Sequence, residues 1–284
     1  MWKKMILFAL VGVLIFTACA PEDEEGDGTV NLATSPYEDA ISLHYLAKYI
    51  LETEMGYEVN MQRADLGAIF TSVAAGDIDA YLATWLPVTH ESYMEEHGDD
   101  MEDLGKTYEG ARLGLTVPAY VDIDSIEELN AHSDNFDNEI IGIDSGAGIM
   151  ELTEDAIEAY DLELELIHSS AEAMTATLQE AYENEEWIVV PGWTPHLKFA
   201  RMDLKFLEDP ELVYGEEEDV YVKAWKGFSE EKPEVAEFFE NIYLTDEEYG
   251  ELIDTFDDYG EGEEAEAAAE WMENNRDTVE EWIP

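Results

Sequence analysis

The chain is predicted to be an α/β protein, because short apolar runs alternate with amphipathic segments along most of its 284 residues. Two successive blocks show this alternation, and each ends in a tryptophan followed by a proline, in Trp85-Leu86-Pro87 and in Trp193-Thr194-Pro195. Alternating strands and helices favour mainly parallel sheets covered by helices. A tryptophan at the carboxyl end of a strand lies where open α/β sheets bind their ligands.

The first block begins with an expected strand at 30–33. Ser35-Pro36-Tyr37-Glu38 follows as a capping box with proline at the first helical position, and it predicts a helix to about Glu54. The block is completed by a strand, a helix and a third strand, at 57–61, 68–75 and 80–83.

A strand at 112–117 leads out of the first block, and Ser125-Ile126-Glu127-Glu128 caps a short helix. The second block repeats the order of the first. Its strands are expected at 140–143, 163–167 and 188–190, and its helices at 148–160 and 171–183. A strand at 221–224 returns the chain to the first lobe. Apolar spacing over 233–284 predicts helices that pack on that lobe.

Two indoles in separate blocks suggest a cleft with aromatic walls on both sides. Trp85 and Trp193 would then surround a methylated ammonium group, which binds to aromatic faces. Tyr37, at the first helix start, is a third candidate for this cage. The competing interpretation is that these residues belong to the hydrophobic core, as we expect for the other tryptophans, among them Trp187, Trp225, Trp271 and Trp282.

A glycine-rich turn lies between the strand at 140–143 and the helix that follows it. The first N–H groups of a helix have no partner within the helix, so those of Gly148 and Ile149 can bind a carboxylate without a basic side chain. His90 is a further candidate donor to that carboxylate, or else a packing residue. Together with the cage, this turn predicts a site for a zwitterion.

The composition is strongly acidic, with 70 Asp and Glu against 13 Lys and Arg and a net charge of −57. Because 46% of the residues are apolar and 11% aromatic, the chain is expected to fold rather than to remain disordered. A carboxylate-dense surface is tolerated in concentrated salt, where screening weakens repulsion. This charge argues against nucleic acid and anionic lipid surfaces as partners.

The first residues are predicted to be a signal peptide, residues 1–18, with a short basic region before an apolar run. The apolar run is too short to span a bilayer stably. Cys19 is the only cysteine, and its position after Thr17-Ala18 resembles the lipidated cysteine of bacterial lipoproteins. An ordinary secreted protein with a stray cysteine is the alternative. Residues 19–29 are expected to form a flexible acidic tether.

Four motifs together resemble the substrate-binding lipoproteins of glycine betaine ABC transporters, from about Val30 to the carboxyl end. They are Thr-Trp-Leu-Pro-Val-Thr-His at 84–90, Gly-Ile-Asp-Ser-Gly-Ala-Gly-Ile-Met at 142–150, Gly-Trp-Thr-Pro-His at 192–196 and Asp-Leu-Lys-Phe-Leu-Glu-Asp-Pro at 203–210. The sequence departs from this family at Tyr37, where tryptophan is expected, and at Leu197, where an aromatic is common.

The resemblance implies a type II periplasmic-binding-protein fold, in which a hinge joins two α/β lobes and the ligand lies between them. Lobe 1 would comprise 30–115 and 222–284, and lobe 2 would comprise 116–221. It also implies an aromatic cage at Tyr37, Trp85 and Trp193, with the carboxylate held by the amides of Gly148 and Ile149 and by His90.

The function expected from this resemblance is an extracytoplasmic receptor of a halophile that delivers glycine betaine to an ABC transporter permease for osmoprotection. We expect a monomer without a cofactor or metal, attached to the membrane only through a lipid on Cys19. The alternatives are a receptor for choline, carnitine or proline betaine, and an extracellular hydrolase or metalloenzyme on the same scaffold. The sequence lacks Gly-x-Ser-x-Gly, His-Glu-x-x-His and any metal-ligand spacing among its six histidines, and no catalytic residue is assigned.

Overall fold

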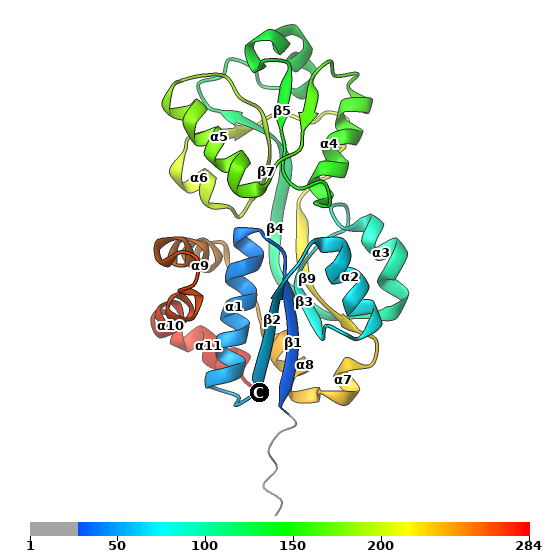
Figure 1. The fold of residues 1–284 in the computed structure, drawn as a ribbon, viewed down its shortest axis with the longest axis vertical. Coiled ribbons are helices and arrows are strands. Elements are labelled where there is room, and N and C mark those ends of the chain that lie inside the picture. The colour runs from blue at the N-terminus through cyan, green and yellow to red at the C-terminus, as the bar shows by residue number, and fades with distance from the viewer. Residues whose placement is uncertain (1–27) are drawn as a thin grey trace, which may run out of the picture.

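The computed structural model describes residues 28–284, so the expected signal peptide and Cys19 lie outside the described residues. Figure 1 shows two lobes, one above the other, joined by strands that run through a narrow waist. The lower lobe contains the described amino-terminal end and the carboxyl terminus. None of the helices in the described part is long and apolar enough to cross a membrane.

The lower lobe begins with the strand-helix alternation that the sequence predicts. Its first elements, in chain order, are β1 (Thr29–Thr34), α1 (Glu38–Thr53), β2 (Glu58–Arg63), α2 (Leu66–Ala75), β3 (Ala80–Leu86), α3 (Glu91–His97) and the 3₁₀ turn η1 (Gly98–Asp100). β1 pairs in parallel with both β2 and β3. In Figure 1, α1 lies on one side of this sheet and α2 and α3 lie on the other.

The upper lobe holds the second block. It comprises the 3₁₀ segment η2 (Ile126–Phe136), β5 (Glu139–Ile141), α4 (Gly148–Ala159), β6 (Glu165–Ile167), α5 (Ala171–Glu183), β7 (Val190–Thr194), α6 (Leu197–Arg201) and β8 (Leu204–Phe206). β5 and β6 form a separate parallel pair. The predicted capping box is present, since Ser125 accepts a hydrogen bond from the backbone of Glu127 and Glu128 accepts one from the backbone of Ser125.

The last part of the chain returns to the lower lobe. β9 (Glu218–Trp225) is followed by α7 (Phe228–Glu231), α8 (Pro233–Asn241), α9 (Asp246–Tyr259), α10 (Glu264–Asn274) and α11 (Arg276–Trp282). α9 and α10 contact α1, on the side of the sheet where Figure 1 shows them. Trp271 and Trp282 stack in this layer with ring centres 6.0 Å apart, so these two tryptophans belong to the core, as expected.

The expectation of mainly parallel sheets is wrong for the middle of the molecule. β4 (Met101–Pro118) has 18 residues and pairs antiparallel with β9, β7 and β8 in turn, and β9 also pairs antiparallel with β3. The main sheet therefore has the order β2-β1-β3-β9-β4-β7, with β8 on β4. Only 112–117 was expected as a strand, because bulges near Gly105 and Gly110 break the alternating pattern. Both glycines have positive φ, which L-residues rarely adopt.

β4 and β9 are the strands that pass between the lobes. The partner of β4 changes from β9, which it pairs as far as Ala111, to β7, which it pairs from Arg112 onward. This change lies close to the expected lobe boundary at residue 115. The division into 30–115 with 222–284 and 116–221 stays a prediction.

The start of α1 differs from the expected capping box. Tyr37 is the N-cap residue with extended backbone, and its side chain makes no capping hydrogen bond. Ser35 instead shares a buried 2.9 Å hydrogen bond with the hydroxyl of Tyr81. The helix therefore begins at Glu38, two residues later than the position of Pro36, and this shift leaves the ring of Tyr37 free to face the upper lobe.

Candidate functional site

A cavity lies between the two lobes and encloses about 380 Å³ of atom-free space, its mouth included. All six residues that the sequence suggested for ligand binding line it: Tyr37, Trp85, His90, Gly148, Ile149 and Trp193. Three of them come from the lower lobe and three from the upper lobe. The remaining lining is largely apolar, which is usual for a small-molecule site.

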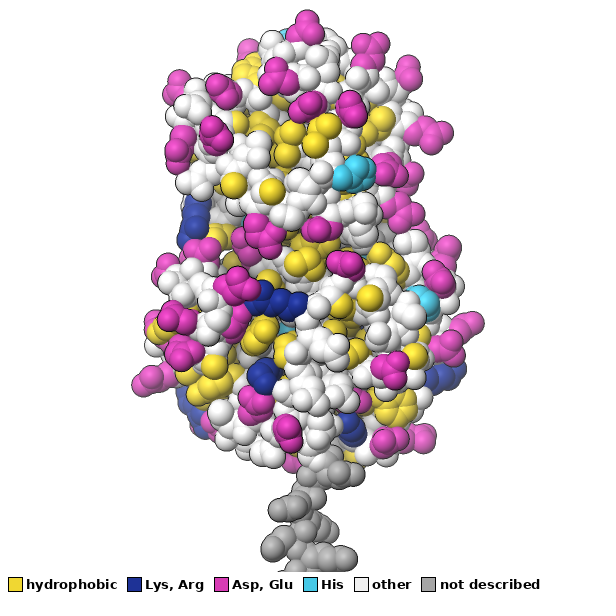
Figure 2. Space-filling view, in the orientation of Figure 1, with side chains coloured by type: hydrophobic (Ala, Val, Ile, Leu, Met, Phe, Trp, Pro, Cys, Tyr) yellow, Lys and Arg dark blue, Asp and Glu magenta, His cyan; other side chains and the backbone are white. Residues whose placement is uncertain are grey.

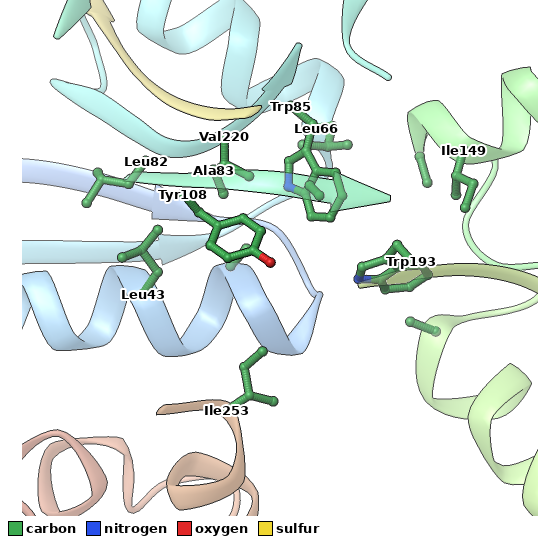
Figure 3. Packing of buried hydrophobic residues seen from close by; sticks show 14 of the residues in the cluster. Leu43, Leu66, Leu82, Ala83, Trp85, Tyr108, Ile149, Trp193, Val220 and Ile253 are labelled. Carbon is green, nitrogen blue, oxygen red and sulfur yellow. The ribbon is translucent and has the colours of Figure 1, made fainter. Parts of the chain in front are cut away.

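The two tryptophans of the cavity come from different lobes. Trp85 lies near the end of β3, and Trp193 lies on β7, where it pairs with Leu113 of β4. Each is only 5% exposed. Figure 3 shows Trp85 on one side of the gap between the lobes, with Trp193 and Ile149 on the other side. The ring of Tyr37 meets that of Trp193 edge to face, with centres 6.0 Å apart. Three aromatic rings are thus collected around one small space.

The indole of Trp193 is held by a hydrogen bond that crosses between the lobes. Its Nε1 donates to Oδ1 of Asp39 on α1 over 3.3 Å. Asp39 is buried and also lines the cavity. Burial raises the pKa of this carboxyl, and the hydrogen bond from Trp193 lowers it. Burial has the larger effect, so the pKa is about 6. Asp39 is not among the residues predicted from the sequence, because one acidic residue among 70 carries no distinguishing signal.

His90 is a neutral hydrogen-bond donor at the cavity wall. Its Nδ1 accepts the backbone N–H of Trp85 over 2.9 Å, so the ring proton is on Nε2. Burial lowers the pKa of His90 to about 3. Nε2 makes no hydrogen bond to any other residue within 28–284. The imidazole therefore offers one N–H to a ligand without adding a charge.

The start of α4 supplies two further donors. Ala147 is the N-cap residue and makes no side-chain capping bond, so the N–H groups of Gly148 and Ile149 have no partner within the helix. Both residues are buried at the cavity. The amino end of a 12-residue helix carries partial positive charge. These two amides and His90 together can bind an anionic group.

A buried carboxylate holds the turn that carries His90. Glu218, at the start of β9 and 1% exposed, accepts the backbone N–H groups of Val88 and Thr89, the latter over 3.0 Å. It also accepts the hydroxyl of Thr89. Glu218 is not among the residues predicted from the sequence, because nothing in its local sequence distinguishes it from its acidic neighbours Glu216 and Glu217.

The lobes touch at one side of the cavity. A Cβ atom on Gly148 would overlap the carbonyl oxygen of Thr89, so only glycine allows this approach. Nearby, the hydroxyl of Tyr93 donates to the carbonyl of Gly146 over 2.7 Å. Ser92 donates to Glu151 over 3.0 Å. The structure is thus a closed arrangement of the two lobes.

Metal binding finds no support in the described part of the chain. Residues 28–284 contain no group of three or more His, Cys, Asp or Glu side chains placed to hold a metal ion. The cavity residues instead offer aromatic faces, apolar contacts, three N–H donors and one carboxylate. Such a set is suited to a small molecule that has an apolar part and an anionic part.

Residues 28–274 match the protein family described as the substrate-binding domain of ABC-type glycine betaine transport systems, OpuAC. The chain is 40% identical over 175 residues to the glycine betaine/carnitine transport binding protein GbuC of Listeria monocytogenes. This alignment covers 61% of the chain and 56% of GbuC, so the match spans little more than half of that relative.

Three solved structures share the architecture. The glycine betaine/L-proline-binding protein ProX of Borrelia burgdorferi is 34% identical with a TM-score of 0.87, and the match covers 90% of this chain and 97% of ProX. Closed lactococcal OpuAC with glycine betaine is 29% identical with a TM-score of 0.86, and the match covers 91% of this chain and 100% of OpuAC. A choline-binding protein of an ABC transporter, in complex with choline, is 28% identical with a TM-score of 0.82. The match covers 90% of this chain and 91% of that protein. The predicted periplasmic-binding-protein fold is confirmed by these likenesses.

Proposed function

The chain belongs to the family of substrate-binding domains of ABC-type glycine betaine transport systems, and from this premise we propose that it captures glycine betaine and presents it to an ABC importer. The observation that carries the proposal is the cavity itself. Aromatic rings from both lobes meet there with unpartnered N–H donors from the start of α4. The first set suits a trimethylammonium group and the second suits a carboxylate.

In this proposal, the trimethylammonium lies among Tyr37, Trp85 and Trp193. Each aromatic face contributes roughly 0.5 to 2 kcal/mol to binding a desolvated cation. The carboxylate accepts the amides of Gly148 and Ile149. These assignments are supported by the way the six residues line one cavity.

His90 would donate the third hydrogen bond to the carboxylate. It is suited to this because its buried imidazole is neutral and its Nδ1 is already occupied by the backbone of Trp85. A neutral donor stabilises the carboxylate without attracting other anions from solution.

The ligand would favour the closed form because it contacts both lobes at once. Tyr37, Trp85 and His90 come from the lower lobe, while Gly148, Ile149 and Trp193 come from the upper lobe. A ligand that binds closed lobes more tightly than open lobes shifts the equilibrium toward closure. The importer would then recognise the closed, loaded form.

The family consists of transport binding domains rather than enzymes, and we propose the same for this chain. We further propose that it works outside the cytoplasm as a monomer, anchored through a lipid on Cys19. Replacing Cys19 with serine should release the protein from membranes into the medium, as followed by fractionation. Retention of that variant on membranes would contradict the anchor.

The test of the ligand is tryptophan fluorescence and calorimetric titration of residues 20–284 in molar salt. Glycine betaine, proline betaine, carnitine, choline and proline are compared. We expect saturable binding of betaines. Absence of any response from protein shown to be folded by circular dichroism would contradict the proposed function.

Choline is a second candidate because the cavity contains one buried carboxylate, Asp39. A carboxylate favours a ligand with net positive charge more than a zwitterion. Choline lacks the carboxylate that would accept the amides at the start of α4. Binding of choline but not of glycine betaine in the same titration would select this alternative.

A further inference from the structure

Lys198 is a buried lysine with an amine that has no hydrogen-bond partner among residues 28–284. It lies in the first turn of α6 and is 1% exposed. Its Nζ lies 3.7 Å from the centre of the Trp193 ring. Lys198 does not line the cavity, whereas Trp193 does. The same indole therefore contacts a lysine amine and the space in which we place the ligand.

Three ionisable groups face this amine. Glu38 and Asp39 lie on α1 and raise the pKa of Lys198, but burial outweighs them and lowers it to about 7. Burial also raises the pKa of Glu38 to about 7. His196, at the start of α6, accepts the backbone N–H of Lys198 through Nδ1 over 3.2 Å. Burial and the nearby lysine hold the pKa of His196 well below its usual value, so it stays neutral.

Two further charges lie next to Glu38. Arg201 of α6 and Asp257 of α9 form an ion pair with each other and act on Glu38 in opposite directions. One carboxylate oxygen of Glu38 is buried and has no hydrogen-bond partner in the described part of the chain. The lysine and its acidic neighbours thus form a charged cluster that is only loosely paired.

We propose that Lys198 is a specificity-determining residue: its amine behind the aromatic cage disfavours ligands with net positive charge relative to zwitterions. This inference rests on the proposed function and names the substrate class of the same site. A cation already on the indole weakens the attraction of that ring for a second cation. Like charges also repel across a weakly polarisable interior. A betaine offsets this repulsion because it carries its own carboxylate, which choline lacks.

The sign of the pH dependence follows from the same groups. Raising the pH removes the proton from Lys198 and ionises Glu38 and Asp39. Each of these changes makes the surroundings of the cavity more negative, so each favours a quaternary ammonium ion. Choline affinity should therefore rise with pH through the neutral range, and glycine betaine affinity should rise less. His196 stays neutral over this range and contributes no step.

The experiment is calorimetric titration of choline and glycine betaine into the wild type and Lys198→Met between about pH 6 and pH 8.5. Methionine keeps the length of the side chain and removes its charge. Molar salt is used throughout, because it screens exposed charges and leaves buried ones largely unscreened. Lys205→Met is the matched control. Lys205 lies on β8 of the same lobe, pairs with Asp124 over 2.7 Å and does not line the cavity.

We expect Lys198→Met to bind choline roughly tenfold more tightly and glycine betaine less than about threefold more tightly at about pH 6, where Lys198 of the wild type is largely protonated, and the difference should shrink above about pH 7. Its choline affinity should rise less with pH than that of the wild type. Lys205→Met should keep the wild-type ratio of the two affinities. The inference would be overturned if the wild type and Lys198→Met had the same ratio of choline affinity to glycine betaine affinity and the same dependence of choline affinity on pH. The proposed function would then remain intact.

Two other outcomes are decisive. If the wild type is folded and binds neither ligand, the proposed function fails and this inference fails with it. If Lys198→Met does not fold, Lys198→Gln, which also removes the charge, takes its place, because ionisation of Glu38 and Asp39 alone would make choline affinity rise with pH in the wild type. A choline affinity that does not rise with pH relative to that of glycine betaine would overturn the inference.

Discussion

Trp193 is the residue at which the two lobes, the cavity and a buried lysine meet. Its ring faces Tyr37, its Nε1 bonds to Asp39, and Lys198 lies over it. Lys198 belongs to the same lobe as Trp193, whereas Tyr37 and Asp39 belong to the other lobe. Both lobes therefore hold the ring in this orientation only in the closed form.

Trp193→Ala and Trp85→Ala should each weaken glycine betaine binding by more than about tenfold, because each removes one aromatic face from the cation. The measurement is calorimetric titration in molar salt. Trp187→Ala is the control, since Trp187 packs against His132 and Phe136 and does not line the cavity. Equal losses in all three variants would contradict the cage assignment.

Glu218 acts on the site through the turn at 87–90. Glu218→Ala leaves the half-buried N–H of Val88 and the buried N–H of Thr89 without an acceptor, at a cost of about 1–3 kcal/mol for Thr89 and less for Val88. We expect a lower melting temperature and glycine betaine binding weakened by roughly tenfold or more. Thermal melts and titrations measure the two effects.

Two variants distinguish this role from a general loss of stability. Glu218→Gln keeps an oxygen that accepts both N–H groups and should restore most of the affinity. Glu216→Ala removes an exposed carboxylate just before the same strand and should behave as the wild type. If Glu218→Ala melts earlier but binds with wild-type affinity, the residue is structural only.

At the scale of elements, the start of α4 combines two tasks. It offers free N–H groups to a ligand, and it packs directly against the backbone of the turn from the lower lobe. Only Gly148 permits both, because a side chain would separate the lobes just where the donors must reach the ligand.

Gly148→Ala should therefore reduce glycine betaine binding by more than about tenfold without destabilising the fold. Gly148 is the first residue of α4, where helix propensity has little effect, and the overlap with Thr89 arises only when the lobes close, so the open form accommodates alanine. Titration measures the first effect and thermal unfolding the second. Gly250→Ala is the matched control, because Gly250 lies within α9 and a Cβ there meets nothing within 4 Å. Wild-type affinity in Gly148→Ala would contradict the role of this contact in closure.

The predicted helices and strands agree best with those of the structure where the sequence pattern involves only neighbouring residues. The helix at 171–183 has the bounds of α5, and the strands at 57–61, 80–83 and 221–224 overlap β2, β3 and β9. The first eleven residues of β4 were missed. Charged side chains in this part pair with residues of β9, as Lys106 does with Asp219 and Asp103 does with Lys223, although Lys106 also pairs with Glu109 of its own strand.

At the scale of the whole molecule, the dominant property is charge. The net charge is −57, and Figure 2 shows acidic side chains spread over the visible face with few lysines and arginines between them. Carboxylates that lie so close together repel one another in dilute buffer. Such repulsion opposes the compact state and weakens as salt screens it.

The melting temperature of residues 20–284 should therefore rise steeply between about 0.1 M and 2 M NaCl, as the screening length falls from about 10 Å to below 3 Å. Circular dichroism melts measure this. Sucrose at matched osmolality is the control, since it adds no ions and should stabilise less. A melting temperature independent of salt would contradict the expectation from the acidic composition that the protein comes from a halophile.

The order of the strands and helices, the acidic surface and the six cavity residues were accessible from the sequence alone. They depend on local features: apolar periodicity, a glycine turn at a helix start, and aromatic-proline motifs after strands. Motifs that resemble one family contain five of these residues, Tyr37 was added from its place at the first helix start, and the structure brings all six to one cavity.

Only the tertiary structure decided which of the abundant charged residues matter. Asp39, Lys198 and Glu218 have no local signal among 70 acidic and 13 basic residues. They become distinctive because folding buries them on α1, α6 and β9, where Asp39 lines the cavity and the other two contact residues that line it. Burial and contacts between distant segments arise only when the chain folds, so they leave no trace in the order of neighbouring residues.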